Sequence, residues 1–145
     1  FEFNLKNLNF FSRKLTKLLK PSDILLLEGE LGVGKTTFTR FLISSIFINE
    51  NILPPPSIKS PTFPIIISYN LSNYELFHYD FYRINKINEL DEIGFFENIR
   101  NNITIIEWPE IIEKKLNKYY KIKFSIIDQH IRKIILSHST KDIMI

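Results

Sequence analysis

The sequence contains no cysteine and no alanine, and it has only four glycines among its 145 residues. The lack of cysteine excludes a disulfide framework and a thiolate metal site. No apolar run approaches the ~20 residues that a membrane-spanning helix requires. The first residues have neither the basic start nor the apolar core of a signal peptide. We therefore expect a cytoplasmic protein that does not contact a membrane.

The residues that are present suffice for one hydrophobic core. Apolar residues make up 44% of the chain, and its length is that of a single domain spanning residues 1–145. The net charge of +3 permits contact with nucleic acid but does not indicate it, because many exposed lysines are simply solvated surface.

The most informative stretch is 29–36 (GELGVGKT), which fits the phosphate-binding pattern G-x-x-x-x-G-K-[ST]. The apolar run 24–27 before it has the length of a buried strand, and 36–47 after it reads as a helix. Glycines let the backbone curl so that several N–H groups point at one phosphate, and the helix N-terminus adds partial positive charge. These flanking elements favour a phosphate-binding P-loop over a chance Lys-Thr pair in a glycine-rich turn.

The end of this motif predicts specific contacts with a bound nucleotide. Lys35 is expected to reach the β- and γ-phosphates, and the Thr36 hydroxyl is expected to hold Mg²⁺. Thr37 can add a contact to the α-phosphate.

The tetrapeptide Ser60-Pro61-Thr62-Phe63 follows a proline-rich loop at residues 54–56. Many P-loop proteins place the segment that senses the γ-phosphate between the P-loop helix and the next strand. Thr62 is the candidate contact. An ordinary Ser-Pro turn explains the same residues equally well.

Residues 74–82 read as a strand that pairs back on residues 63–69 to form a hairpin. Alternation along it puts His78 and Asp80 on the same face of the sheet. The pattern leaves open whether that polar pair belongs to a site or faces solvent.

Residues 103–107 (ITIIE) are typical of a Walker B strand, in which an acid follows a β-branched run. In a parallel sheet Glu107 then lies close to the P-loop, where Mg²⁺ would be held. Glu107 can bind the metal directly, bind it through a water, or polarise the attacking water.

The remaining segments predict structure more than chemistry. We expect a helix over 9–19, a helix over 87–99 with a break at Gly94, a helix from Pro109 to about Asn117, and a closing hairpin of 119–128 and 131–138. Arg132 follows the hairpin turn and can reach a nucleotide, although a charged edge strand explains it as well. His130 and His138 lack partners at metal-ligand spacing.

Four segments together resemble the TsaE family. They are 29–37 (GELGVGKTT), 60–63 (SPTF), 78–83 (HYDFYR) and 107–110 (EWPE), in the order and rough spacing of that family. The resemblance implies a small bacterial Mg²⁺-dependent ATPase that acts with TsaD and TsaB to attach threonylcarbamoyl to adenosine 37 of tRNA. It implies contact with tRNA only through the complex. We expect a monomer or weak oligomer.

The resemblance also assigns roles to individual residues. It implies that Leu31, Gly32, Val33, Gly34, Lys35 and Thr36 cradle the phosphates of ATP and that Thr36 and Glu107 are the Mg²⁺ ligands. It makes Asp80 a catalytic carboxylate, Thr62 part of a switch-like loop, and Arg132 a nucleotide contact. Lys35 is expected to neutralise the charge that develops during the reaction.

From these observations we predict an α/β, three-layer P-loop NTPase fold with a mostly parallel central sheet and antiparallel hairpin additions. The predicted reaction is phosphoryl transfer from ATP to water, with Asp80 or Glu107 orienting the water. Two other functions stay open. A small-molecule kinase requires an acceptor pocket and arginines over the phosphates, for which Arg83 and Arg100 are candidates. A nucleotide-gated adaptor binds ATP without turnover.

Overall fold

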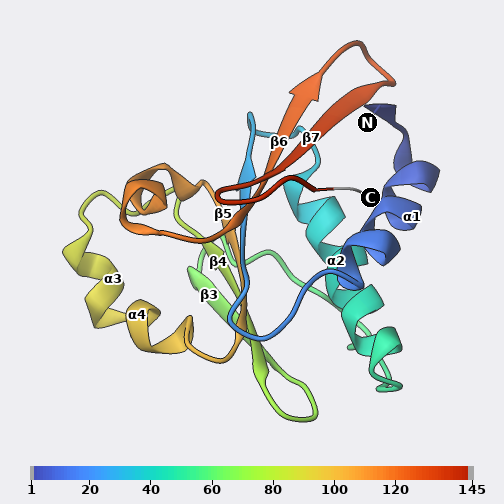
Figure 1. Cartoon of the computed structure of the whole chain (residues 1–145). Coiled ribbons are helices and arrows are strands. Elements are labelled where there is room, and N and C mark those ends of the chain that lie inside the picture. Colours follow the sequence, from blue (N-terminus) through green and yellow to red (C-terminus); the bar gives the residue numbers. More distant parts are fainter. Residues whose placement is uncertain (1, 144–145) are drawn as a thin grey trace.

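The computed structural model describes residues 2–143, and the side chains of all of these except residues 2, 3, 5 and 6. Within this range seven strands form one sheet in the order β1-β7-β6-β2-β5-β4-β3 (Figure 1). The strands are β1 (Glu2–Phe3), β2 (Ile24–Glu28), β3 (Ile66–Asn70), β4 (Glu75–Asp80), β5 (Ile103–Glu107), β6 (Tyr120–Ile126) and β7 (Arg132–His138). The helices are α1 (Leu5–Thr16), α2 (Lys35–Asn49), α3 (Asn88–Glu92) and α4 (Phe95–Asn98), and short 3₁₀ turns η1 (Pro109–Ile111) and η2 (Glu113–Lys115) follow β5.

The centre of the sheet is parallel. β2 pairs in parallel with β5 and with β6, and β4 pairs in parallel with β5. The β3–β4 hairpin adds an antiparallel strand at one edge, while the β6–β7 hairpin and β1 do so at the other. This arrangement confirms the predicted α/β fold with a mostly parallel central sheet and antiparallel additions. Because β2, β4 and β5 run in the same direction, their carboxyl ends lie side by side at one end of the strands.

Helices cover both faces of the sheet, with α1 and α2 on one face and α3 and α4 on the other (Figure 1). The side chains of β2 alternate between two hydrophobic clusters. Leu25 and Leu27 belong to the cluster packed by α1 and α2, whereas Ile24 and Leu26 belong to the cluster packed by α3 and α4. Burial on both faces explains why this strand reads as an uninterrupted apolar run.

The boundaries of two predicted helices follow from single residues. α1 begins at Leu5 rather than near residue 9, because the side chain of Asn4 accepts a 3.2 Å hydrogen bond from the Asn7 backbone N–H and so caps the helix. The predicted break at Gly94 is confirmed: this residue adopts φ 68° and separates α3 from α4.

The predicted helix from Pro109 to Asn117 is wrong. The residues form η1 and η2, in which the N–H groups of Ile112 and Lys115 bond to carbonyls three residues earlier. The segment must cross back from the carboxyl end of β5 to the start of β6, because both strands run parallel to β2. A 3₁₀ turn rises about 2.0 Å per residue, against about 1.5 Å for an α-helix, so it covers more of that distance.

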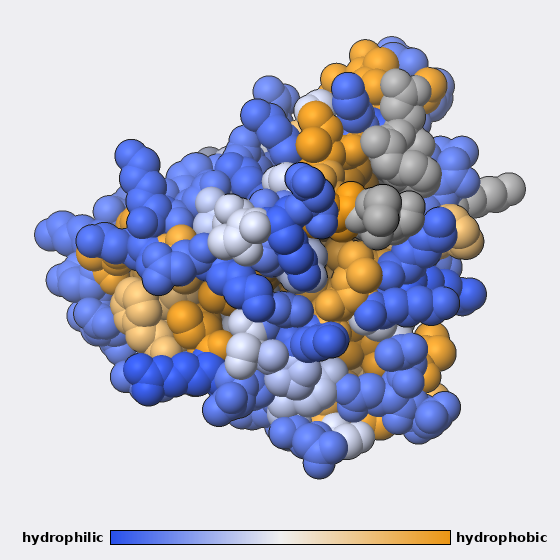
Figure 2. Space-filling model, viewed as in Figure 1, coloured by the Kyte–Doolittle hydropathy of each residue, from blue (hydrophilic) through white to orange (hydrophobic). Residues whose placement is uncertain are grey.

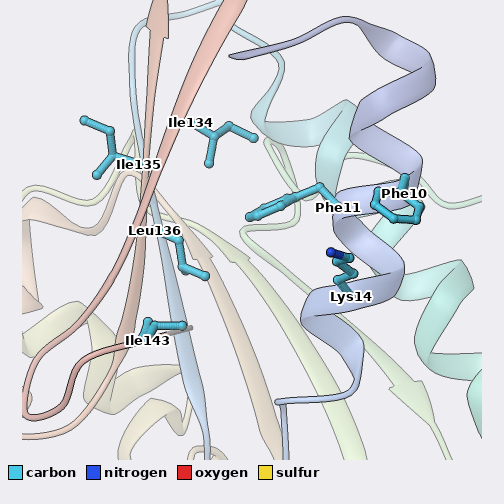
Figure 3. A pocket seen from close by; sticks show the side chains of 7 residues that line it. All are labelled: Phe10, Phe11, Lys14, Ile134, Ile135, Leu136 and Ile143. Carbon is cyan, nitrogen blue, oxygen red and sulfur yellow. The ribbon is translucent and has the colours of Figure 1, made fainter. Parts of the chain in front are cut away.

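The surface over β7 and α1 is partly apolar. Figure 2 shows hydrophobic side chains gathered along the β6–β7 hairpin and between it and α1. A cavity of about 360 Å³ lies there, lined by Phe10, Phe11, Lys14, Ile134, Ile135, Leu136 and Ile143. Phe11 of α1 and Ile134 of β7 point toward each other across it (Figure 3). This cavity contains none of the predicted site residues. None of the helices within residues 2–143 is long and apolar enough to cross a membrane.

Candidate functional site

The predicted phosphate-binding loop connects β2 to α2. Gly32 and Gly34 adopt φ values of 77° and 113°, a region that favours glycine. Gly34 immediately precedes α2, and its carbonyl accepts a 2.9 Å hydrogen bond from the Phe38 N–H. The loop therefore lies against the N-terminus of a 15-residue helix, where free N–H groups and the helix dipole favour an anion.

A cavity of about 190 Å³ opens at this loop. Its lining is Leu31, Gly32, Gly34, Lys35, Thr36, Thr37, Thr62, Asp80, Glu107 and Trp108. It thus brings together residues from the P-loop, the SPTF segment, the end of β4 and the end of β5. Nine of the predicted site residues line this one cavity, although they are spread over most of the sequence.

Two predicted site residues, Val33 and Arg132, do not line this cavity. The Val33 side chain is 1% exposed and belongs to the core beneath α1 and α2, so only its backbone is available to a ligand. Arg132 turns back onto its own hairpin, where Nη1 donates 2.7 Å and 3.3 Å hydrogen bonds to the carbonyls of Asp128 and Ile131. The nucleotide contact of Arg132 stays a prediction.

Thr36 and Glu107 meet directly. The Thr36 hydroxyl donates a 3.1 Å hydrogen bond to Oε2 of Glu107, whose other oxygen, Oε1, lies 2.9 Å from Nε2 of His78. Glu107 is buried at the end of β5. A hydroxyl and a carboxylate side by side are hard oxygen donors of the kind that Mg²⁺ prefers.

Asp80 lies beside Glu107, because the two residues are register partners on β4 and β5. Its Oδ2 accepts a 3.2 Å hydrogen bond from the Thr62 hydroxyl, and its Oδ1 accepts one of 2.9 Å from the Tyr82 N–H. The hydroxyl of Ser60 lies 2.8 Å from that of Thr62. The SPTF segment is thus joined to β4 through side chains, and Asp80 is buried in a site rather than facing solvent.

Lys35 is a buried residue at the start of α2. Its Nζ donates hydrogen bonds to the carbonyls of Gly29 and Glu30 and lies 4.0 Å from the centre of the Trp108 ring. Burial lowers the pKa of Lys35 below its usual value, while the negative charges of Glu107, Asp80 and Glu110 oppose that shift. The charge is therefore held in a site where it interacts strongly with anions.

Trp108 and His78 are site residues to which the sequence reasoning assigned no role. Trp108 directly follows the Walker B acid and adopts φ 57°, which is unusual for a residue other than glycine. Its position after Glu107 was the one available signal. His78 shares the face of Asp80, and its contact with Glu107 appears only once β4 and β5 are paired.

A network of ion pairs borders the start of the P-loop. Glu28 contacts Lys121 at 2.6 Å and Lys123 at 3.3 Å, and Lys121 also contacts Glu113 at 2.8 Å. The hydrogen bond from Lys121 lowers the pKa of Glu28, with Lys123 contributing to the same effect against a smaller desolvation penalty. These contacts tie the end of β2 to β6.

The sheet order, the loop between β2 and α2, and the acid at the end of β5 define a protein of the P-loop class. The sequence model of the family described as "Threonylcarbamoyl adenosine biosynthesis protein TsaE" matches residues 4–134. The chain belongs to the TsaE family, whose members are tRNA threonylcarbamoyladenosine biosynthesis proteins.

Individual relatives agree with this assignment. The TsaE protein of Rickettsia felis is 40% identical over 126 residues, which cover 83% of this chain and 71% of that protein. The TsaE protein of Bacillus subtilis is 38% identical over 98 residues, which cover 67% of this chain and 57% of that protein. The crystal structure of Bacillus subtilis YdiB superposes with a TM-score of 0.65 at 28% identity, covering 92% of this chain and 80% of that one.

Proposed function

We propose that this protein is a Mg²⁺-dependent ATPase of the machinery that makes threonylcarbamoyladenosine at position 37 of tRNA, and that it acts with TsaD and TsaB. The observation that carries the ATPase proposal is the 3.1 Å contact between Thr36 and Glu107 in the same cavity as Lys35. This is the set of groups that P-loop proteins use to hold a nucleoside triphosphate and its metal ion. TsaD, TsaB and the tRNA site come from the resemblance of the chain to the family.

The residues of the cavity fit a bound Mg²⁺. Thr36 and Glu107 supply two oxygen donors, and no cluster of three His, Cys, Asp or Glu side chains that could hold a metal occurs within residues 2–143. Mg²⁺ at nucleotide sites usually takes one or two protein ligands, with phosphates and waters completing its shell. When bound, the metal ion would neutralise negative charge on the β- and γ-phosphates.

Each remaining group has a distinct task in the proposed reaction. The loop amides and the N-terminus of α2 bind the phosphates, and Lys35 neutralises the charge that develops as the bond between the γ-phosphorus and the bridging oxygen breaks. The oxygen of water forms the new bond to phosphorus, and ADP and phosphate are released. Glu107 contacts Thr36 and is assigned with it to the metal ion, so we assign orientation of the water to Asp80.

ATP hydrolysis with Mg²⁺, measured on the chain alone and with TsaB, TsaD and tRNA, tests this proposal. We expect release of free phosphate that rises when the partners are present. Lys35→Ala should reduce turnover by ~10²–10³-fold, the usual cost of one lost transition-state contact of this type. Tight ATP binding without turnover in any mixture would favour an adaptor instead. Phosphate recovered on an added acceptor would favour a kinase.

A further inference from the structure

The side chain of His78 is completely buried in the middle of β4. Its Nε2 lies 2.9 Å from Oε1 of Glu107, and both side chains are at most 3% exposed. Since an ionised carboxylate only accepts hydrogen bonds, Nε2 carries the hydrogen and donates it. Register explains the contact: His78 is paired with Ile105 on β5, and Glu107 is the next residue on the same face of that strand.

The other ring nitrogen of His78 indicates how the ring is used. Nδ1 is buried and has no hydrogen-bond partner among residues 2–143. An N–H at that position would be a donor without an acceptor, which is costly inside a protein. The surroundings therefore suit a ring whose one hydrogen bond is donated from Nε2 to Glu107.

The contact matters because it fixes the orientation of the Glu107 carboxylate. The terminal torsion of a glutamate is soft and roughly two-fold, so a carboxylate held at one oxygen only is free to rotate. Here Oε1 is held by His78, while Oε2 accepts the hydrogen bond from Thr36. Together these two contacts hold Oε2 of Glu107 on the side of the Thr36 hydroxyl.

We infer that His78 is a positioning residue that holds the Glu107 carboxylate with Oε2 directed to the Mg²⁺ side of the cavity. The inference rests on the proposed function, since it assigns His78 a task only if Thr36 and Glu107 hold a metal ion. Groups that hydrogen-bond a metal ligand from behind are worth ~10–100-fold in metal affinity.

The test measures how much Mg²⁺ the protein needs to bind a nucleotide more tightly. The readout is the Mg²⁺ concentration at which half of the maximal increase in nucleotide affinity is reached. The probe is adenylyl imidodiphosphate, a non-hydrolysable ATP analogue, titrated at a series of Mg²⁺ concentrations and also without metal. The variants are His78→Phe, which keeps a ring but removes the donor, and His78→Gln, whose amide N–H reaches the position of Nε2. His138→Gln, at a histidine of β7 outside the cavity, is the matched control, and melting temperatures without ligand report on folding.

We expect His78→Phe to require ~10–100-fold more Mg²⁺, with metal-free nucleotide affinity unchanged, and His78→Gln to recover most of the loss. Should His78→Phe fold poorly, His78→Asn takes its place, because its shorter amide does not reach Glu107. An unchanged Mg²⁺ requirement in the donor-free variants would overturn the inference while leaving the proposed function intact. Equal losses in His78→Gln and His78→Phe would also overturn it. Nucleotide binding by the wild type that does not respond to Mg²⁺ would overturn the metal role itself, and the inference with it.

Discussion

The Thr62 hydroxyl donates a 3.2 Å hydrogen bond to Oδ2 of Asp80, which ties the segment before β3 to the carboxyl end of β4. The second oxygen of Asp80 is held by the Tyr82 N–H at 2.9 Å. The carboxylate that we assign to orient water is thus fixed from two sides. One of these contacts comes from a loop and is accessible to mutation without altering the carboxylate itself.

Thr62→Val should therefore reduce ATP turnover more than it reduces ATP binding. Valine keeps the shape of threonine but has no hydroxyl, so Asp80 loses one of its two holding contacts; misplacing a reacting group by ~1 Å can cost ~10²-fold. Steady-state hydrolysis and equilibrium binding measured side by side separate the two effects. Thr62→Ser retains the hydroxyl and should stay close to wild type. Wild-type turnover in Thr62→Val would contradict this role for Thr62.

Nucleotide binding should change the fluorescence of Trp108, which is the only tryptophan in the sequence. The Lys35 ammonium lies 4.0 Å from the centre of its ring, and attraction of that cation toward phosphates alters the field at the ring. We expect a saturable change in emission with ATP and a much smaller one in Lys35→Ala. Adenosine, which has no phosphate, serves as the control ligand. An equal response to adenosine would show that the signal does not come from the P-loop.

Gly29→Ala should destabilise the protein more than Gly32→Ala. A Cβ on Gly29 would lie 2.9 Å from Cγ1 of Val33 and 3.0 Å from the backbone oxygen of Phe124, which cannot move without disturbing β6. Overpacking of this kind costs about 1–3 kcal/mol. A Cβ on Gly32 meets no atom of the described chain within 4 Å, so its cost is confined to the backbone strain of φ 77°. Urea unfolding of both variants measures the difference, and an equal loss of stability would contradict it.

Stability should fall as the pH is lowered through the acidic range, and Glu28→Gln should remove part of that fall. The pKa of Glu28 is lower in the folded chain than in the unfolded chain, where it is about 4.3. Its contribution is therefore fully present above that value and is lost as the pH falls through the folded-state pKa. For a half-buried ion-pair network we expect a difference of about 1 kcal/mol at pH 7.

Urea unfolding of wild type and Glu28→Gln between pH 3 and pH 7 measures this contribution. The two stability curves should converge at the acidic end. Glu92→Gln, at an exposed acid of α3, is the control. Its stability should depend on pH in the same way as that of the wild type. A constant gap between wild type and Glu28→Gln at all pH values would mean that the carboxylate charge is not responsible.

Local patterns in the sequence were sufficient to predict the parts of the fold that depend on neighbouring residues. The apolar run of β2, the glycine-rich loop and the break at Gly94 each depend on a few consecutive side chains, and all three occur as predicted. The proximity of Glu107 to Lys35 and Thr36 also followed, because parallel strands bring their carboxyl ends to one end of the sheet. The place of Asp80 in the same cavity was implied only by the resemblance to the TsaE family.

Features that depend on distant segments were not predictable in the same way. The contact of His78 with Glu107 requires the register of β4 on β5, and the folding of Arg132 onto Asp128 depends on the geometry of one turn. The 3₁₀ turns after β5 are set by the distance that the chain must cross, although residues 109–117 are apolar and polar in a helical pattern. Ile65, at φ 68°, lies outside β3, which begins at Ile66, against its own β-branched preference.

The position of β2 in the sheet sets the order in which the site can be assembled during synthesis. Leu25 is paired with Ile105 on one side and with Tyr120 on the other, so the strand that carries the P-loop has neither neighbour until most of the chain has been made. Contacts between segments so far apart in sequence form slowly, because a long loop must close before they contribute. A nascent chain that ends before β5 therefore contains every residue of the P-loop but lacks both strands that flank β2 in the sheet.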